Sequence, residues 1–153
     1  KTGLEVNLRL VGGFNPQDPY YKAVNQSIMD LGLHASIRFE GYMTDTDQIY
    51  RNTHISLMCA ENEGMGRVTV ESMLRGIPVV AYDAAGTSEI IEHNVDGILY
   101  KGDAATLASE IKALLTDREK YSAISRQAQI SAQTKYNVAI YRDKFKALVD
   151  SIA

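Results

Sequence analysis

Two glutamates, Glu63 and Glu71, are the residues of this sequence best placed to do chemistry. Gly64 and Gly66 follow the first glutamate closely, and glycine lets another group approach the backbone because it has no side chain. A helix predicted to begin at Arg67 would present amides that have no partner within the helix. Such helix N-termini bind phosphate through their N–H groups and the positive end of the helix dipole.

The helix dipole alone cannot hold a phosphate tightly, because it contributes only about 0.3–1 kcal/mol at an exposed site. A nucleoside diphosphate therefore needs several contacts at once. The glycine pattern is also weak by itself. It lacks the third glycine of the dinucleotide-binding fingerprint, and no second strand ending in an acid follows at the required distance.

Glu71 is the more informative of the two acids. It lies within a predicted helix over residues 67–75 that is rich in apolar side chains, so its carboxylate must face an opening or a partner. Ribose hydroxyls suit it, since a charge-assisted hydrogen bond contributes roughly 1.5–3 kcal/mol. Arg67, Glu71 and Arg75 also have the spacing of a salt-bridge ladder on one helix face. Spacing alone leaves both interpretations open.

The elements that must position these glutamates alternate between short apolar runs and helical patterns. Strands separated by helices predict parallel βαβ units and a doubly wound, Rossmann-like α/β sheet. The strand at residues 55–59 is nearly all apolar and is expected to be buried on both faces. Strands are predicted at residues 6–11, 36–39, 55–59, 78–82 and 97–100, and helices at 18–31, 45–51, 67–75, 88–92, 103–115, 118–134 and 138–152.

A doubly wound sheet binds its ligand beyond the carboxyl ends of its strands. That rule selects four loops as candidates, at residues 12–13, 41–44, 60–66 and 83–87. The third of these contains Glu63 and both nearby glycines.

Composition indicates an ordinary globular protein, since 45% of the 153 residues are hydrophobic and 23% are charged. We expect one domain over residues 1–153. The net charge of −3 argues against a nucleic-acid partner. No apolar secretory leader is visible at the start, so we expect a cytoplasmic protein, and the lack of an initiator Met indicates a piece of a longer one. The single cysteine, Cys59, excludes an internal disulfide.

Charge is distributed unevenly along the chain. Residues 1–117 hold 9 basic and 16 acidic side chains, whereas residues 118–153 hold 7 basic and 3 acidic ones. A basic C-terminal segment can dock on an acidic partner or on the inner face of an anionic membrane, which would make the protein a peripheral membrane protein. The alternative is a pair of solvated helices.

The central block resembles glycosyltransferase family 4 and related enzymes of the GT-B fold. The residues Glu63-Gly64-Met65-Gly66-Arg67-Val68-Thr69-Val70-Glu71 are similar to that family's paired-glutamate motif, in which seven residues separate the two acids. Similar segments follow in order at residues 76–81, 85–91 and 96–99. The resemblance covers nearly the whole chain.

The resemblance implies the C-terminal half of a retaining glycosyltransferase, active in polysaccharide or glycoconjugate biosynthesis. Its donor would be a UDP- or GDP-linked sugar and its acceptor a glycan or a lipid-linked sugar. It implies no metal and no cofactor. The partner would be the enzyme's own N-terminal acceptor domain, which is absent from this chain, together with a basic pair of residues that neutralises the diphosphate.

The resemblance also implies a role for each matching residue. Glu63 would lie beside the donor sugar, close to the reacting carbon, and Glu71 would hold the ribose. Gly13 would shape a turn that faces the cleft. Tyr42 and Met43 would lie near the base. The amides that would meet the sugar and diphosphate belong to Gly64, Met65, Gly66, Arg67 and Val68. One departure is that residues 58–60 read Met-Cys-Ala where the family often has Pro-Ser, so the base side is expected to differ.

Three other interpretations compete with this one. Asp45-Thr46-Asp47 resembles the metal-binding Asp-x-Asp motif of the other large glycosyltransferase fold, although Asp and Thr are also expected where a helix begins. A sugar-nucleotide epimerase or a phosphorylase would share the same architecture. A non-catalytic α/β interaction module, such as a receiver-like domain, would need acids after the first strand, where this chain has Gly12-Gly13-Phe14-Asn15.

Overall fold

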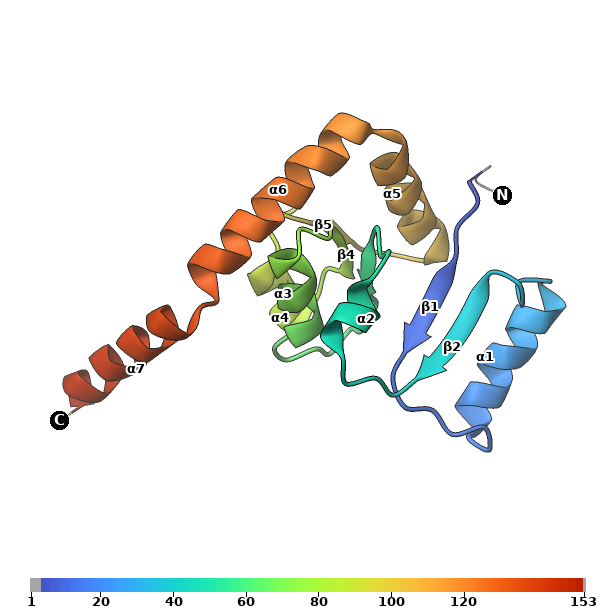
Figure 1. Cartoon of the computed structure of the whole chain (residues 1–153), viewed down its shortest axis with the longest axis horizontal. Coiled ribbons are helices and arrows are strands. Elements are labelled where there is room, and N and C mark those ends of the chain that lie inside the picture. The colour runs from blue at the N-terminus through green and yellow to red at the C-terminus, as the bar shows by residue number, and fades with distance from the viewer. Residues whose placement is uncertain (1–3, 153) are drawn as a thin grey trace. The chain divides into compact units, whose positions relative to one another are not determined.

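The structure is a computed structural model that describes residues 4–152 (Figure 1). It contains two compact units, Lys1–Asn52 and Thr53–Ala153, which we treat separately. In both units the strands pair in parallel and alternate with helices. The predicted fold class, α/β with parallel sheets, is confirmed. The prediction of a single donor-binding domain over residues 1–153 stays a prediction.

The first unit is built on two parallel strands. Strand β1 (Leu8–Val11) pairs with β2 (Ile37–Gly41), and helix α1 (Pro19–Asp30) connects them. Asp18 begins the helix, because its Oδ1 accepts hydrogen bonds from the amides of Tyr20 and Tyr21. The rings of Phe14 and Tyr21 stack with centroids 5.0 Å apart, and the Tyr21 ring meets Phe39 of β2 at 4.9 Å. These aromatic contacts attach α1 to the strand pair.

Arg9 joins β1, β2 and helix α2 (Thr46–Tyr50) within this unit. Its Nε and Nη2 donate to the two carboxylate oxygens of Glu40 on β2, at 2.8 and 2.7 Å. The same guanidinium donates to the backbone carbonyls of Gln48, Ile49 and Arg51, at 3.2, 2.9 and 3.2 Å. Its guanidinium thus hydrogen-bonds to backbone carbonyls at the C-terminal end of α2. Arg9 therefore connects three elements with five hydrogen bonds.

The contribution of the Arg9–Glu40 pair to stability is expected to depend on pH. The hydrogen bond from Arg9 holds the pKa of Glu40 below its ordinary value of 4.5. A lowered pKa in the folded state stabilises the fold above the unfolded pKa, and this stabilisation is lost as the pH falls through the folded value. The Tm difference between wild type and Glu40→Gln should therefore fall by roughly half or more between pH 7 and pH 3.

Thermal unfolding followed by circular dichroism measures this difference. Glu5→Gln, which changes an exposed carboxylate just before β1, is the matched control and should show little dependence on pH. A Tm difference for Glu40→Gln that stays constant down to pH 3 would show that the pair contributes nothing to stability.

The second unit holds a three-stranded parallel sheet in the order β3-β4-β5. The sequence places one or more helices after each strand (Figure 1). The strands are β3 (Ser56–Met58), β4 (Val79–Tyr82) and β5 (Ile98–Tyr100). The helices are α3 (Arg67–Leu74), α4 (Ala85–Ile90), α5 (Ala104–Thr116), α6 (Arg118–Lys135) and α7 (Val138–Ile152).

Two apolar clusters cover the two faces of this sheet. Alternate residues of a strand point to opposite faces, so Val79 and Ala81 join one cluster and Val80 joins the other. Helices α3 and α4 supply the first cluster, and α5 supplies the second. Helix α6 reaches both, with Ala128 and Ala132 in the first cluster and Ile124 in the second. Helices on both faces are what the doubly wound prediction requires.

Strand β3 differs from its prediction. Within the second unit it pairs only with β4, which makes it an edge of this sheet. Its side chains are half-buried, whereas Val79, Val80 and Ala81 of the neighbouring β4 are fully buried. The expectation that residues 55–59 are buried on both faces is therefore wrong for this sheet. An apolar run shows that a strand avoids water, but it does not show how many strands flank it.

Candidate functional site

The site is built around the loop that joins β3 to α3, residues 59–66. Strand β3 ends at Met58, and α3 begins at Arg67, as the sequence predicts. Glu63 is half-buried in this loop, whereas Met65 is 60% exposed. The loop therefore presents backbone and a carboxylate beyond the carboxyl end of the sheet, where α/β proteins bind their ligands.

Gly66 is required by the packing of this loop. A methyl group at position 66 would lie 3.0 Å from Oγ1 of Thr69 and 3.5 Å from Cγ of Glu63. Gly66 is itself buried. The absent side chain therefore lets the first turn of α3 and the Glu63 side chain come together. The approach of a ligand to this backbone, which the glycines were expected to permit, stays a prediction.

Among residues 4–152, no side chain caps the N-terminus of α3. The amide of Arg67 nevertheless donates to the Met65 carbonyl at 2.7 Å, so the expectation that this amide is free for a ligand is wrong. Gly66 occupies the capping position, and the helix begins with a hydrogen bond from the Val70 amide to the Gly66 carbonyl, at 3.2 Å. Thr69 lies in the first turn, fully buried, and its Oγ1 has no hydrogen-bond partner among residues 4–152. An uncapped helix N-terminus attracts anions. The Thr69 hydroxyl lies next to Gly66, so this end of α3 holds a buried polar group whose hydrogen bond is not made by residues 4–152.

Glu71 lies on the second turn of α3 and is half-buried. The helix packs Thr69, Val70, Ser72 and Met73 into the protein, which leaves Glu71 at the border of the buried face. Arg75 donates from Nη1 to the backbone carbonyl of Glu71, at 3.3 Å. This geometry is compatible with a salt-bridge ladder of Arg67, Glu71 and Arg75 and also with a contact between Glu71 and a ribose. Both remain predictions.

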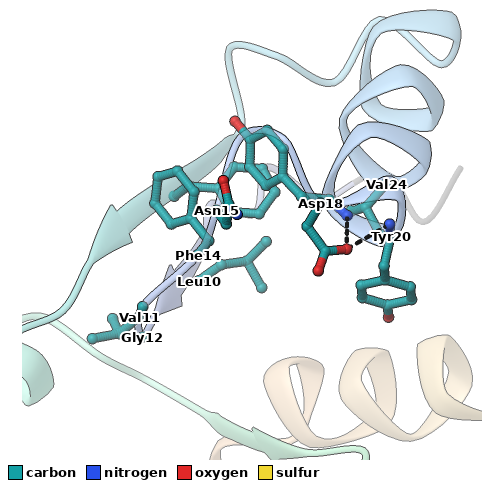
Figure 2. Close-up of a pocket in the computed structure, with 11 residues that line it drawn as sticks. Leu10, Val11, Gly12, Phe14, Asn15, Asp18, Tyr20 and Val24 are labelled. Atoms are coloured by element: carbon teal, nitrogen blue, oxygen red, sulfur yellow. Dashed lines mark hydrogen bonds between the residues drawn. The ribbon is translucent and has the colours of Figure 1, made fainter.

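Gly13 lies in the first unit, at an open cavity of about 440 Å³ that follows β1 (Figure 2). The cavity is lined mainly by apolar and aromatic side chains, among them Leu10, Phe14 and Tyr20. Figure 2 shows Asp18 there, with its carboxylate occupied by the amides at the start of α1. The turn after β1 thus shapes a concave surface, as the sequence predicts for one of its four candidate loops.

Tyr42 and Met43 directly follow β2, also in the first unit. Tyr42 is 79% exposed and Met43 is half-buried. The structure therefore brings Glu63, Gly64, Met65, Gly66, Arg67, Val68 and Glu71 together in the second unit, and places Gly13, Tyr42 and Met43 in the first. The assignment of these three residues to a shared site stays a prediction.

The Asp45-Thr46-Asp47 segment begins α2. Oδ1 of Asp45 accepts hydrogen bonds from the amides of Asp47 and Gln48, at 2.9 and 3.2 Å, and these bonds lower the pKa of Asp45. This is the helix-capping arrangement that the sequence offered as the alternative to a metal motif. Among residues 4–152, no three His, Cys, Asp or Glu side chains gather closely enough to hold a metal ion.

Cys59 and Tyr100 meet where β3 and β5 end. Burial raises the pKa of Tyr100 to about 12, and its hydrogen bond with Cys59 adds to this effect. Tyr100 therefore keeps its proton at neutral pH and cannot serve as a general base. This contact occupies the position where the sequence departs from the family's Pro-Ser.

Sequence reasoning placed residues 83–87 among the candidate loops but missed the contact that the start of α4 makes there. The helix begins at Ala85, three residues before its predicted start at Ser88, and the amide of Gly86 donates to the carbonyl of Glu63 at 3.0 Å. Glu89 is exposed on α4. The glycine before Thr87 is the only signal in the sequence that could have indicated this contact.

Fold and site together define the class of protein. An α/β fold with parallel sheets is the architecture of the Rossmann-like C-terminal half of GT-B glycosyltransferases. In this chain a glycine-containing loop follows β3 and leads into α3. The chain belongs to the family described as glycosyl transferases group 1, which matches residues 1–131.

Solved structures of HepE from Anabaena resemble the chain closely. The complex of HepE with UDP superposes with a TM-score of 0.89 at 32% identity, and covers 95% of this chain and 41% of that one. The complex with UDP-glucose gives a TM-score of 0.87 at 34% identity, with the same coverage. HepE therefore has this fold and was crystallised with a nucleotide sugar.

Two relatives are a synthase and a glycosyltransferase by name. N-acetyl-alpha-D-glucosaminyl L-malate synthase of Bacillus anthracis is 25% identical over 136 residues, which are 88% of this chain and 35% of that protein. The lipopolysaccharide core biosynthesis glycosyltransferase LpsE of Rhizobium meliloti is 24% identical over 147 residues, 95% of this chain and 42% of LpsE. The chain thus spans about two fifths of the relatives that it matches, and homologues act in polysaccharide biosynthesis.

Proposed function

We propose that this chain is the donor-binding domain of a retaining glycosyltransferase. The complete enzyme moves a sugar from a nucleoside-diphosphate sugar to a glycan or a lipid-linked acceptor. One observation carries the proposal: Glu63 and Glu71 lie on either side of the uncapped start of α3, in the order and spacing of the family's paired glutamates. A UDP-linked sugar is the first donor to test, because HepE was crystallised with UDP-glucose. A GDP-linked sugar is the alternative.

In this proposal the donor lies across the N-terminus of α3. The backbone from Gly64 to Val68 receives the sugar and the diphosphate, and the absent side chains of Gly64 and Gly66 let the ligand approach. Glu63 accepts hydrogen bonds from sugar hydroxyls, and Glu71 accepts them from the ribose. Gly13, Tyr42 and Met43 belong to the first unit, and their part in donor binding is proposed from the family resemblance alone.

The acceptor half of the enzyme is proposed to lie in a further domain. The chain covers 41% of HepE, so HepE has more than this chain alone contains. Transfer requires two reactants held in register and shielded from water. A donor-binding half supplies the ribose and sugar contacts but does not close over the donor.

Peripheral contact with the inner face of a membrane is the last part of this proposal. No helix over residues 4–152 is both long enough and apolar enough to cross a membrane. Helix α7, however, exposes apolar side chains at helical spacing and carries Arg142, Lys144 and Lys146. The exposed apolar residues are Val138, Tyr141, Phe145, Leu148, Val149 and Ile152. Such a helix can lie in a lipid interface. Sedimentation with anionic vesicles tests this, and no binding to them by the complete enzyme would reject it.

Calorimetric titration of the 153-residue chain tests the donor assignment. We expect UDP or GDP to bind, UDP-glucose to bind where the donor is UDP-glucose, and no sugar transfer to occur without the rest of the enzyme. Failure of both nucleoside diphosphates to bind would favour a non-catalytic α/β module. Interconversion or phosphorolysis of the sugar by the complete enzyme, without transfer, would favour the epimerase or phosphorylase.

Transfer by the complete enzyme is expected to need no divalent cation. The start of α3 offers amides and a dipole to the diphosphate, and Asp45 of the alternative metal motif is used as a helix cap. A chelator should leave the initial rate of transfer within about twofold of its starting value, because no step depends on a metal-bridged phosphate. A strong loss of rate that manganese restores would instead identify Asp45 and Asp47 as metal ligands.

A further inference from the structure

The backbone of α4 contacts the loop that joins β3 to α3, residues 59–66, which we call the donor loop. The amide of Gly86 donates to the carbonyl of Glu63 at 3.0 Å. The contact is closer than any side chain would permit: a Cβ on Gly86 would lie 1.6 Å from the carbonyl oxygen of Gly64, where real Cβ atoms keep beyond 3.0 Å. The carbonyl of Gly64 would have to move by more than about 1 Å to admit even alanine.

The residue before this contact has an unusual conformation. Ala85 has φ of +47°, in the left-handed region that residues with a side chain rarely adopt. Strained backbone persists where the surrounding structure fixes it, and it concentrates at functional sites. The conformation of Ala85 directs Gly86 towards the donor loop.

Helix α4 is itself fixed to the rest of the second unit. Asp83 at its start accepts a hydrogen bond from Oγ of Ser88 at 2.7 Å, and pairs with Nζ of Lys101 at 2.9 Å. Ile90 at its end, with Ile91 just after it, lies in the apolar cluster on one face of the sheet. The amide of Gly86 therefore belongs to a rigid element, whereas the loop it contacts is partly exposed.

We propose that Gly86 is a positioning residue for the sugar-binding glutamate. Its amide fixes the carbonyl of Glu63, and its missing side chain lets the carbonyl of Gly64 pack against α4, so that the Glu63 carboxylate is held in register with the start of α3. This inference rests on the proposed function, because it assigns Glu63 to the donor sugar. Gly86 itself touches no substrate in this scheme and acts through Glu63.

Hydrogen exchange of the complete enzyme tests the contact between Gly86 and the donor loop independently of any donor. In Gly86→Ala, a peptide covering residues 60–68 should exchange at least about tenfold faster than in wild type. Ala85→Gly, which removes a methyl and relieves the left-handed strain, should leave this peptide unchanged. Gly76→Ala is the matched destabilising control: Gly76 has φ of +68° at the other end of α3, so this change should lower Tm without affecting the loop.

Kinetics with UDP-glucose test positioning. Gly86→Ala should lower kcat about 10- to 100-fold, because a misplacement of 1 Å can cost this much. The Kd of UDP should rise by a smaller factor, because the proposed ribose contact at Glu71 lies outside the displaced loop. The double variant Gly86→Ala/Glu63→Gln should be no more than about twofold slower than the slower single variant, since both changes remove the same contact. Gly76→Ala should keep kcat per folded molecule.

Each way of failing has a distinct signature. Unchanged hydrogen exchange of residues 60–68 in Gly86→Ala overturns the claim that Gly86 fixes the donor loop. Faster exchange with fully additive losses of kcat overturns positioning through Glu63. Failure of the wild-type enzyme to bind UDP or GDP overturns the proposed function. The exchange experiment still shows whether Gly86 fixes the donor loop. If Gly86→Ala does not fold, Ser88→Ala replaces it: losing the bond to Asp83 should loosen the same peptide in the same direction, and no change there overturns the proposal.

Discussion

Glu63→Gln in the complete enzyme is expected to slow sugar transfer on the order of 100-fold, with the Kd of UDP changed less than threefold. Glu63 lies on the loop before α3, on the sugar side of the proposed donor, and UDP without its sugar has nothing there to lose. A charge-assisted hydrogen bond to a hydroxyl contributes roughly 1.5–3 kcal/mol. Where that bond strengthens as charge develops at the reacting carbon, its loss appears in kcat.

Steady-state kinetics with UDP-glucose, alongside calorimetry with UDP, separate these two effects. Glu61→Gln is the matched control, because Glu61 is an exposed carboxylate in the same loop, two residues away. The control should keep both kcat and the Kd of UDP. Equal small effects of Glu63→Gln on rate and on binding would mean that this glutamate is structural.

The sequence predicted the parts of this site that depend on local pattern. Gly66 and the start of α3 at Arg67 follow from glycine and helix-start rules, and both lie where those rules put them. Each strand and helix begins within three residues of its predicted start, and the largest shift is at α4, a helix of six residues.

The contact between Gly86 and the donor loop could not have been predicted in the same way. It joins residues that are more than twenty positions apart in the chain, and it depends on how closely α4 approaches the loop. Helix-start rules favoured Ser88, because serine and an acid suit the beginning of a helix, whereas tertiary packing places Ala85 there in a strained conformation. The position of β3 at the edge of the second unit's sheet could not be predicted either, because the composition of one strand does not determine which strands pair with it.

The hydroxyls of Thr69 and Thr87 show a further limit of sequence reading. Both side chains are fully buried, and neither hydroxyl has a hydrogen-bond partner in the part of the chain that the structure describes. Nothing in a sequence distinguishes such a threonine from one that simply fills space in a helix. In the structure Thr69 lies against Gly66 and Thr87 follows Gly86, so the two orphaned hydroxyls flank the donor loop and its contact with Gly86. Buried polar groups without partners are rare, and they concentrate where function requires them.

Glu71→Gln is expected to produce the opposite pattern to Glu63→Gln. If Glu71 holds the ribose, the change should weaken binding of UDP by roughly 1.5–3 kcal/mol, about ten- to more than a hundredfold in Kd. The ribose is present in UDP and UDP-glucose alike, so the loss should be the same for both ligands. Transfer at saturating donor should change much less than binding does.

The competing ladder makes a different prediction, and Arg75→Gln is the variant that separates the two. Arg75 lies one turn after Glu71 and already donates to its backbone carbonyl. If Glu71 serves only this ladder, both variants should lower stability by at most about 1 kcal/mol and leave the Kd of UDP unchanged. If Glu71 serves the ribose, only Glu71→Gln should weaken UDP binding. Calorimetry on the two variants decides between them, because truncating either partner removes the ladder, whereas only one of the two removes the carboxylate that the ribose needs.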